Sequence, residues 1–249
     1  MRIIGIIPAR YQSERLPGKP LIDLLGKTMI ARTYEQVSKV KSFSEIVVAT
    51  DDQRIYDEVV SFDGKVIMTS SDHCSGTDRC ADAIKQLGYN TGDFIVVNIQ
   101  GDEPFILPEQ IEELVHCFDN NEIGIATLIK KIESEDDLLN SNVVKVVKTN
   151  FDNALYFSRF PIPFKRNTSI GNVVHYRHIG MYAYRGDILN QIVKLPVSSL
   201  EKAESLEQLR WLQAGYSIHT HVSQYEHAFG IDTQDDVQKA IQYIQGYHL

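Results

Sequence analysis

Short apolar runs alternate with helix-length amphipathic stretches through the first half of the chain. This pattern predicts strands at 2–8, 45–50, 65–69 and 93–98, and helices at about 28–40, from Asp52, at 77–87 and from Pro108. The fourth strand, Asp-Phe-Ile-Val-Val-Asn, is continuous and β-branched, which is typical of a strand covered on both faces. Strands separated by helices predict βαβ units and a mostly parallel sheet.

The second half of the chain has a different pattern, in which strands follow one another more closely. We expect strands at 143–148, 154–159, 176–184 and 217–222, and helices at about 187–194, 200–213 and from Thr233. The simplest account is one α/β domain with an inserted antiparallel layer. Ligands of such sheets bind beyond the carboxyl ends of the strands.

Composition narrows the class of protein. With 249 residues, of which 43% are hydrophobic, the chain can bury a sizeable core and is not intrinsically disordered. No apolar run approaches the roughly 20 residues of a membrane helix. Cys74, Cys80 and Cys117 lack CxxC spacing, so we reject a zinc site with His73 and expect reduced thiols in a cytoplasmic protein.

The distribution of charge says more than its total. The net charge of −8 argues against a protein that coats nucleic acid. Residues 1–41, however, carry eight Lys and Arg against three Asp and Glu. A basic start on an acidic chain predicts a local anion site.

The loop after the first strand, PARYQSERLPGKPL, carries Arg10, Arg15 and Lys19 among Gly and Pro residues. Backbone N–H groups and fixed cations in such a loop can cradle a polyphosphate. It is not the GxxxxGK[ST] phosphate loop, because Pro20 follows Lys19, and no GxGxxG turn is present. An ordinary solvated basic loop remains an alternative.

Two carboxylates are placed to reach the same crevice. Asp102, in QGDEP, follows the fourth strand directly, and Asp232, in GIDT, precedes the last helix. A plain turn at Asp102 and a helix cap at Asp232 or Thr233 are the alternatives. Like charges about 4 Å apart repel by roughly 4 kcal/mol at an effective dielectric of 20, so two acids beside a triphosphate would need Mg²⁺ between them.

Three further segments carry polar residues that, taken singly, favour a structural role over a catalytic one. HCSGTDR (73–79) precedes a helix that Ser75 or Thr77 could cap, LEQLR (206–210) lies on a predicted helix, and YRHIGMYAY (176–184) alternates as a strand. The alternation places His178, Gly180, Tyr182 and Tyr184 on one face. No GxSxG elbow or HExxH motif is present.

Taken together, these segments resemble the 3-deoxy-manno-octulosonate cytidylyltransferase (CMP-KDO synthetase) family. The matching pieces run in family order from residue 8 to residue 233: PARYQSERLPGKPL, VATDD, SGTDR, QGDEP, VVKVV, ALYFSR, YRHIGMYAY, LEQLR and GIDT. One departure is 234–236, Gln-Asp-Asp, where the family usually has Pro-Glu-Asp. We expect it to alter the helix start and to leave Asp232 in place.

The resemblance implies a Rossmann-like nucleotide-diphospho-sugar transferase fold, with a mostly parallel central sheet and a smaller antiparallel dimerisation layer. It implies one domain over 1–249, with a nucleotide-binding part to about 130, a sugar-binding and dimerisation part to about 215, and a return to the core sheet. The implied reaction is CTP + KDO → CMP-KDO + pyrophosphate with Mg²⁺, in a homodimer that serves lipopolysaccharide synthesis.

The resemblance also implies roles for individual residues. The residues implied to hold the triphosphate are Arg10, Ser13, Arg15 and Lys19, of which Lys19 would neutralise the leaving pyrophosphate. Those implied to border the cytosine pocket are Pro8, Ala9, Ser75, Thr77 and Arg79. Asp102 and Asp232 would hold Mg²⁺. The sugar-acid pocket would be lined by Arg79, Gln100, His178, Tyr182, Glu207 and Gln208.

Other functions fit the sequence less well. The nearest alternative is a cytidylyltransferase for another acidic sugar, such as 8-amino-KDO or a sialic acid. A nicotinamide-dependent oxidoreductase fails on the missing GxGxxG turn. A non-catalytic nucleotide-binding module would be expected to lose the acids or the basic loop, and both are present here.

Overall fold

The structure, a computed structural model, describes residues 1–13, 15–89, 93–167, 169, 171, 173–226 and 229–247. The chain forms two compact units, which are described separately. Unit 1 comprises Met1–Glu112 and His227–Leu249, and unit 2 comprises Glu113–Glu226.

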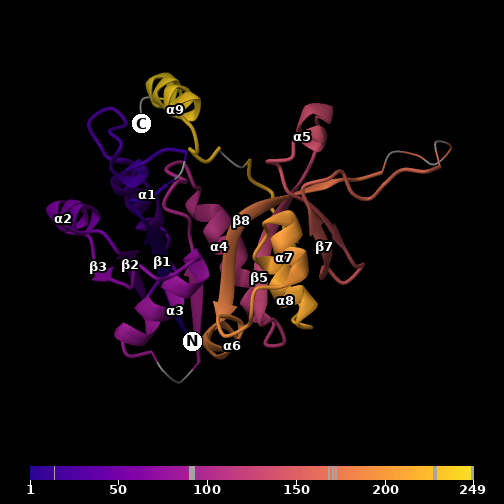
Figure 1. Cartoon of the computed structure of the whole chain (residues 1–249), viewed down its shortest axis with the longest axis horizontal. Coiled ribbons are helices and arrows are strands. Elements are labelled where there is room, and N and C mark those ends of the chain that lie inside the picture. Colours follow the sequence, from indigo (N-terminus) through magenta and orange to yellow (C-terminus); the bar gives the residue numbers. More distant parts are fainter. Residues whose placement is uncertain are drawn as a thin grey trace. The chain divides into compact units, whose positions relative to one another are not determined.

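Unit 1 is built on a parallel sheet (Figure 1). Its strands are β1 (Arg2–Ala9), β2 (Glu45–Thr50), β3 (Val66–Met68) and β4 (Phe94–Asn98), in the order β3-β2-β1-β4. Each strand lies within one residue of its predicted bounds, and β4 is buried along its whole length, as a strand covered on both faces should be. The predicted α/β class with a parallel sheet is confirmed.

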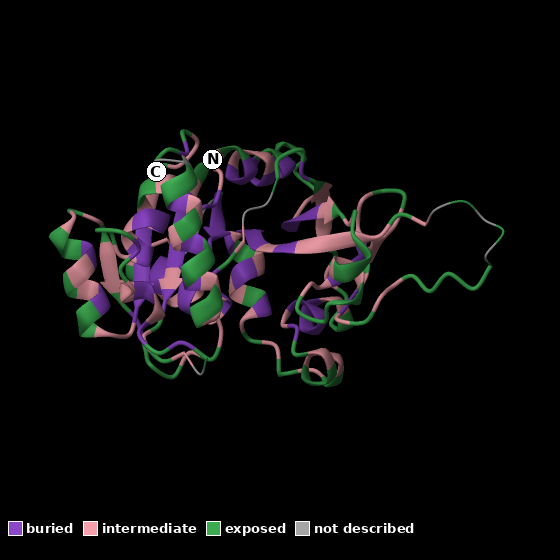
Figure 2. Ribbon diagram, turned by 90° about the horizontal axis from the view of Figure 1, so that it is seen from above, coloured by how far each residue is buried: buried purple, intermediate pink, exposed green. Residues whose placement is uncertain are grey.

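The helices of unit 1 bury one face each (Figure 2). They are α1 (Met29–Val37), α2 (Gln53–Ser61), α3 (Gly76–Gln86), the first part of α4 (Pro108–His116), and α9 (Gln234–Tyr247). The Thr28 side chain caps α1 by accepting from the Ala31 N–H, and Asp52 caps α2 in the same way through the Arg54 N–H. No helix among the described residues is long and apolar enough to cross a bilayer.

The parallel arrangement decides where the polar segments of unit 1 meet. Because β1, β2, β3 and β4 all run in one direction, the segments that follow them emerge at the same edge of the sheet. These segments are the loop that begins at Arg10, the turn at Asp51, the stretch 69–75 and the stretch 99–102. A short 3-10 turn (η1, Lys19–Leu21) ends the first of them.

Unit 2 is a mixed sheet with short helices. Its strands are β5 (Ile125–Lys131), β6 (Lys145–Lys148), β7 (Ala154–Ser158), β8 (Tyr176–Arg185) and β9 (His219–Val222). β5 pairs antiparallel with β8 and parallel with β9, and β6 pairs antiparallel with both β7 and β8. A 3-10 turn (η2, Cys117–Asp119) follows α4, and α6 (Gly186–Ile192) follows β8 directly.

The structure differs from the sequence expectations at three places in unit 2. Strand β5 and the short helix α5 (Glu135–Leu139) were not predicted, although Ile125–Ile129 is a fully buried run. The helix expected at 200–213 is two helices, α7 (Ser199–Glu204) and α8 (Gln208–Gln213). Ser205 adopts a left-handed backbone with φ 53°, which an α-helix cannot continue.

The start of α3 yields a stability prediction. Ser75 and Asp78 form a capping box, in which the Ser75 hydroxyl accepts from the Asp78 N–H at 3.1 Å and the Asp78 carboxylate accepts from the Ser75 N–H at 3.2 Å. Ser75→Ala should lower the free energy of unfolding by about 1 kcal/mol, because one orphan N–H loses its acceptor. Urea denaturation measures this loss.

The matched control is Ser71→Ala, which removes an exposed hydroxyl in the loop before the same helix. It should change the free energy of unfolding by less than about 0.5 kcal/mol. Equal losses in the two variants would contradict the assignment of the cap.

Candidate functional site

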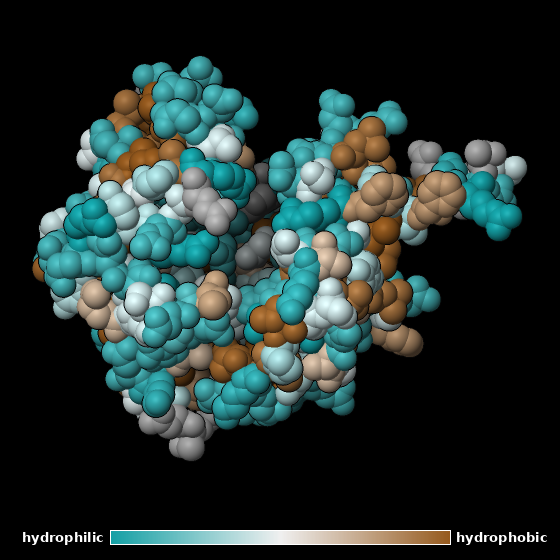
Figure 3. Space-filling model, viewed as in Figure 1, coloured by the Kyte–Doolittle hydropathy of each residue, from teal (hydrophilic) through white to brown (hydrophobic). Residues whose placement is uncertain are grey.

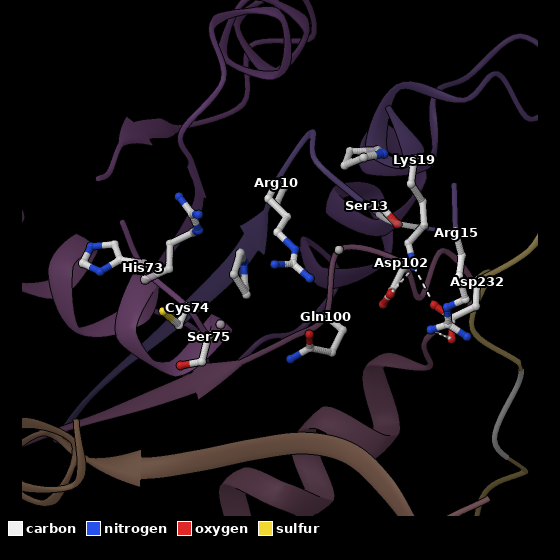
Figure 4. Close-up of a pocket in the computed structure, with 16 residues that line it drawn as sticks. Arg10, Ser13, Arg15, Lys19, His73, Cys74, Ser75, Gln100, Asp102 and Asp232 are labelled. Carbon is white, nitrogen blue, oxygen red and sulfur yellow. Dashed lines mark hydrogen bonds and ion pairs between the residues drawn. The ribbon is translucent and has the colours of Figure 1, made fainter. Parts of the chain in front are cut away.

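A cavity of about 450 Å³ lies at the carboxyl edge of the unit 1 sheet (Figure 4). This volume suits a drug-sized ligand. Eleven of the residues that line it were singled out from the sequence: Pro8, Ala9, Arg10, Ser13, Arg15, Lys19, Ser75, Arg79, Gln100, Asp102 and Asp232. The fold therefore brings the basic loop, the start of α3 and both candidate acids to one site.

Two glycines allow the walls of this cavity to approach each other. A Cβ on Gly101 would lie 3.0 Å from the Pro8 carbonyl oxygen, and a Cβ on Gly76 would lie 3.3 Å from Pro8 Cγ. Any larger residue at position 101 would therefore push the segment after β4 away from the end of β1. Gly76 lies within the Ser75–Arg79 segment that the resemblance places beside the base, whereas the lining residues Pro20, His73, Cys74 and Gly101 were not among the expected site residues.

One ammonium group joins the two acids. Lys19 Nζ donates to Asp102 Oδ2 at 2.5 Å and to Asp232 Oδ1 at 2.8 Å, and Arg15 contacts the other Asp232 oxygen at 3.0 Å. The backbone supports the same contact, because the Ile231 N–H donates to the Asp102 carbonyl at 3.0 Å. Asp102 and Asp232, which lie 130 positions apart in the sequence, therefore direct their carboxylates at the same ammonium group.

These contacts shift the ionisation of the groups. Burial alone would lower the pKa of Lys19, whose side chain is 12% exposed, but the charges and hydrogen bonds of Asp102 and Asp232 outweigh it and raise the pKa. For Asp232, burial raises the pKa, yet the Lys19 and Arg15 contacts lower it overall. Both groups are therefore held in their charged forms.

The cap alternative for Asp232 is settled by its neighbours. The Thr233 hydroxyl accepts from the Asp236 N–H at 3.3 Å, and the Asp236 carboxylate accepts from the Thr233 N–H at 3.0 Å. Thr233 and Asp236 thus form the reciprocal cap of α9, which begins at Gln234. The Asp232 carboxylate faces Lys19 and Arg15 instead.

The cavity is cationic within an acidic chain. Among its described lining residues, the four cations Arg10, Arg15, Lys19 and Arg79 outnumber the carboxylates of Asp102 and Asp232. Arg10 is exposed and extends into the cavity toward Gln100 (Figure 4). The N-terminus of α3, at Ser75 and Gly76, adds the positive end of a helix dipole. Such a wall suits a polyanion.

Arg79 is held more tightly than the sequence indicated. Its guanidinium is almost completely buried, and it donates to Thr69 Oγ1 at 2.6 Å and to Asp51 Oδ2 at 3.0 Å. Asp51 belongs to the VATDD segment, to which we had assigned no role. Asp51 and Thr69 position Arg79 at the cavity wall. Thr77 does not line the cavity, since it is buried in the first turn of α3.

The other predicted sugar contacts form a cluster inside unit 2. His178 and Tyr182 lie on β8 with ring centroids 5.2 Å apart, and Trp211 packs edge-on against Tyr182 at 5.0 Å. The Tyr182 ring contacts both the His178 ring and the Tyr184 ring. The expected alternation along β8 is thus confirmed for these three residues, which share one face of the strand. Burial raises the pKa of Tyr182 well above its usual value, so its hydroxyl stays protonated.

The LEQLR segment sits at the start of α8 beside this cluster. Leu206 and Leu209 are buried in the core, as expected. Glu207 is the N-cap residue of α8, and its charge contributes to the raised pKa of Tyr182. Gln208 is 5% exposed.

The two acids of unit 1 also suit a divalent cation. Their oxygens already converge within hydrogen-bond distance of a single cation, the Lys19 ammonium. Mg²⁺ is bound through one or two carboxylates together with substrate phosphates. Asp102 and Asp232 therefore provide a donor set that fits Mg²⁺ beside a triphosphate.

Known proteins resemble this chain along nearly its whole length. The cytidylyltransferase family model matches residues 4–220. A 3-deoxy-manno-octulosonate cytidylyltransferase of Parabacteroides distasonis is 50% identical over 252 residues, which cover 98% of each chain. One of Cytophaga hutchinsonii is 52% identical over 240 residues, which cover 94% of each chain.

A solved structure shares the fold. It is described as CMP:2-keto-3-deoxy-manno-octonic acid synthetase complexed with CTP, and it matches with a TM-score of 0.92 at 42% identity. The match covers 99% of this chain and 100% of the other. By its sequence and its fold, this chain belongs to the cytidylyltransferase family, among the 3-deoxy-manno-octulosonate cytidylyltransferases.

Proposed function

We propose that this chain transfers the cytidylyl group of CTP to 3-deoxy-D-manno-octulosonate (KDO), which yields CMP-KDO and pyrophosphate for lipopolysaccharide synthesis. The observation that carries the proposal is the convergence of Lys19, Asp102 and Asp232 in a cationic cavity. The relatives named above are enzymes of this reaction class, and one of them was solved with CTP.

The chemistry requires positioning and charge neutralisation more than covalent catalysis. The anomeric hydroxyl of the sugar attacks the α-phosphate in line, and pyrophosphate leaves. Arg10, Ser13 and Arg15 line the cavity, where they would surround the triphosphate, and Lys19 would neutralise the charge that develops on the leaving group. Pro8, Ala9, Ser75 and Arg79 line the same cavity and would border the base.

Asp102 and Asp232 would hold Mg²⁺ near the α-phosphate. The bound metal would supply charge neutralisation and a lowered pKa for the attacking hydroxyl. When the two carboxylates take up this role, the Lys19 ammonium is free to turn toward the phosphates. Its raised pKa keeps it charged for that purpose.

The proposed contacts of the sugar acid are polar side chains. Gln100 and Arg79 line the cavity of unit 1. In unit 2, the His178 and Tyr182 rings contact each other, the charge of Glu207 acts on Tyr182, and Gln208 follows Glu207 in the chain. In this assignment His178 is a hydrogen-bonding contact and no histidine base is needed.

The direct test is pyrophosphate release from CTP. We expect release with KDO in the presence of Mg²⁺, and background release when either KDO or Mg²⁺ is left out. Parallel reactions with 8-amino-KDO and with a sialic acid identify the acceptor, since the better substrate has the higher kcat/KM. Release without any sugar acid, or none with any of them, would contradict the proposed function.

The metal assignment is tested by Asp102→Asn. This isosteric change should lower kcat by at least about 100-fold, because one anionic ligand of the metal is lost while the hydrogen-bonding shape is kept. Asp235→Asn, which neutralises an exposed acid near Asp232, is the matched control and should retain activity. Circular dichroism checks the fold of both variants. Wild-type turnover by Asp102→Asn in saturating Mg²⁺ would overturn the assignment.

We further propose that the enzyme is a cytoplasmic homodimer. Free thiols at Cys74, Cys80 and Cys117 are consistent with a reducing compartment. Unit 2 also presents apolar surface to solvent (Figure 3), which suits a contact between two copies. The exposed apolar side chains of unit 2 include Phe151, Leu155, Phe160 and Phe164.

Sedimentation velocity at micromolar concentration tests the dimer. The wild-type chain should sediment as a dimer, and the double variant Phe160→Asp with Phe164→Asp should shift toward monomer, because charges replace side chains that are 72% and 82% exposed in one copy. Leu25→Asp, at an exposed apolar position of unit 1, is the control and should leave the dimer intact. A monomeric wild-type chain would refute the dimer.

A further inference from the structure

The Thr127 hydroxyl occupies a point where three polar groups of unit 2 meet. Thr127 lies on β5 and is fully buried. Its Oγ1 lies 2.7 Å from the Met181 carbonyl oxygen, 3.3 Å from the Ile179 carbonyl oxygen and 2.9 Å from His178 Nε2. These short approaches are possible because the pairing of β5 with β8 shifts register between Thr127 and Leu128.

The single proton of this hydroxyl limits the directions that its hydrogen bonds can take. Both carbonyl oxygens can only accept, and a threonine hydroxyl has one proton to donate. The shortest contact, 2.7 Å to the Met181 oxygen, is the one that takes this proton, because two oxygens so close need a proton between them. With the proton placed there, the contact between Oγ1 and Nε2 has His178 as the donor and Thr127 as the acceptor.

The His178 ring is also fixed in orientation by its neighbours. Phe157, on β7, contacts it edge-on with centroids 5.2 Å apart, and Tyr182 lies at the same distance from the ring in a tilted geometry. Phe157 is fully buried and Tyr182 is 7% exposed, so neither can move away easily. The ring thus has little freedom to turn its Nε2 away from Thr127.

We propose that Thr127 is a positioning residue that selects the tautomer of His178. Neutral His178 carries its proton on Nε2, and Nδ1 is the acceptor of the ring. Any group that contacts Nδ1, a hydroxyl of the sugar acid included, must therefore donate a proton to it. This inference rests on the proposed function insofar as His178 contacts the sugar, but the tautomer itself does not depend on which substrate binds.

The tautomer is measured by long-range ¹H–¹⁵N NMR on the full chain labelled at histidine, with His178→Gln used to assign the His178 resonances. Above the pH range in which the ring is protonated, the wild-type spectrum should show a protonated Nε2 and an unprotonated Nδ1. Thr127→Val keeps the shape of the side chain and removes the hydroxyl. The spectrum of this variant should no longer show a single tautomer with the proton on Nε2. Thr127→Ser keeps the hydroxyl and should restore it.

The same variants separate positioning from a general structural effect. Thr127→Val should raise the KM for the sugar acid roughly five- to tenfold, as expected for the loss of one oriented hydrogen bond, and leave the KM for CTP unchanged. Thr127→Ser should recover the wild-type KM. Thermal unfolding confirms that the compared variants are folded.

Two results would overturn the proposal. One is a wild-type spectrum with the proton on Nδ1, which needs no variant to be stable. The other is a folded Thr127→Val chain with the wild-type tautomer and sugar KM. Should no sugar acid support turnover, the proposed function fails, yet the NMR measurement still decides whether Thr127 sets the tautomer.

Discussion

The contact of the Lys19 ammonium with Asp102 and Asp232 is the interaction on which the candidate site depends. A largely buried lysine requires a compensating negative charge, and Lys19 has two, on Asp102 and Asp232. The two carboxylates would repel each other without a cation between them. The ammonium therefore ties together the loop after β1, the segment after β4 and the segment before α9. In the proposed reaction, Mg²⁺ would replace the Lys19 ammonium as the cation between the two carboxylates, and Lys19 would then contact the phosphates.

The parallel sheet of unit 1 makes this contact possible. Strands that run in one direction deliver their following segments to one edge, so groups distant in sequence meet there without any long excursion of the chain. Close approach adds a second requirement. Gly101 leaves room for the Pro8 carbonyl, and a side chain in its place would displace the segment that carries Asp102. Sheet direction and the missing Cβ together set the position of the acid.

In unit 2 the aromatic cluster around His178 is positioned by hydrogen bonds and ring packing. Thr127 satisfies a carbonyl that the register shift between β5 and β8 brings near, and it orients His178 at the same time. Burial keeps Tyr182 protonated beside Trp211. Unit 1 thus presents a strongly charged cavity, whereas the cluster of unit 2 is mainly aromatic.

Hydrophobic periodicity alone determined the strands β1 to β4, since a strand covered on both faces must be continuously apolar and its neighbours must be separated by amphipathic helices. Motif composition likewise picked out Arg10, Lys19, Asp102 and Asp232 before their positions were known. Only the tertiary structure decided between the cap and the ion pair for Asp232, because Thr233 and Asp236 compete for the same helix end. It also revealed Asp51, Thr69 and Thr127, whose functions lie entirely in contacts with residues far away in the chain. A hydrogen bond across such a distance depends on strand order and register, and neither is written in the local pattern of residues.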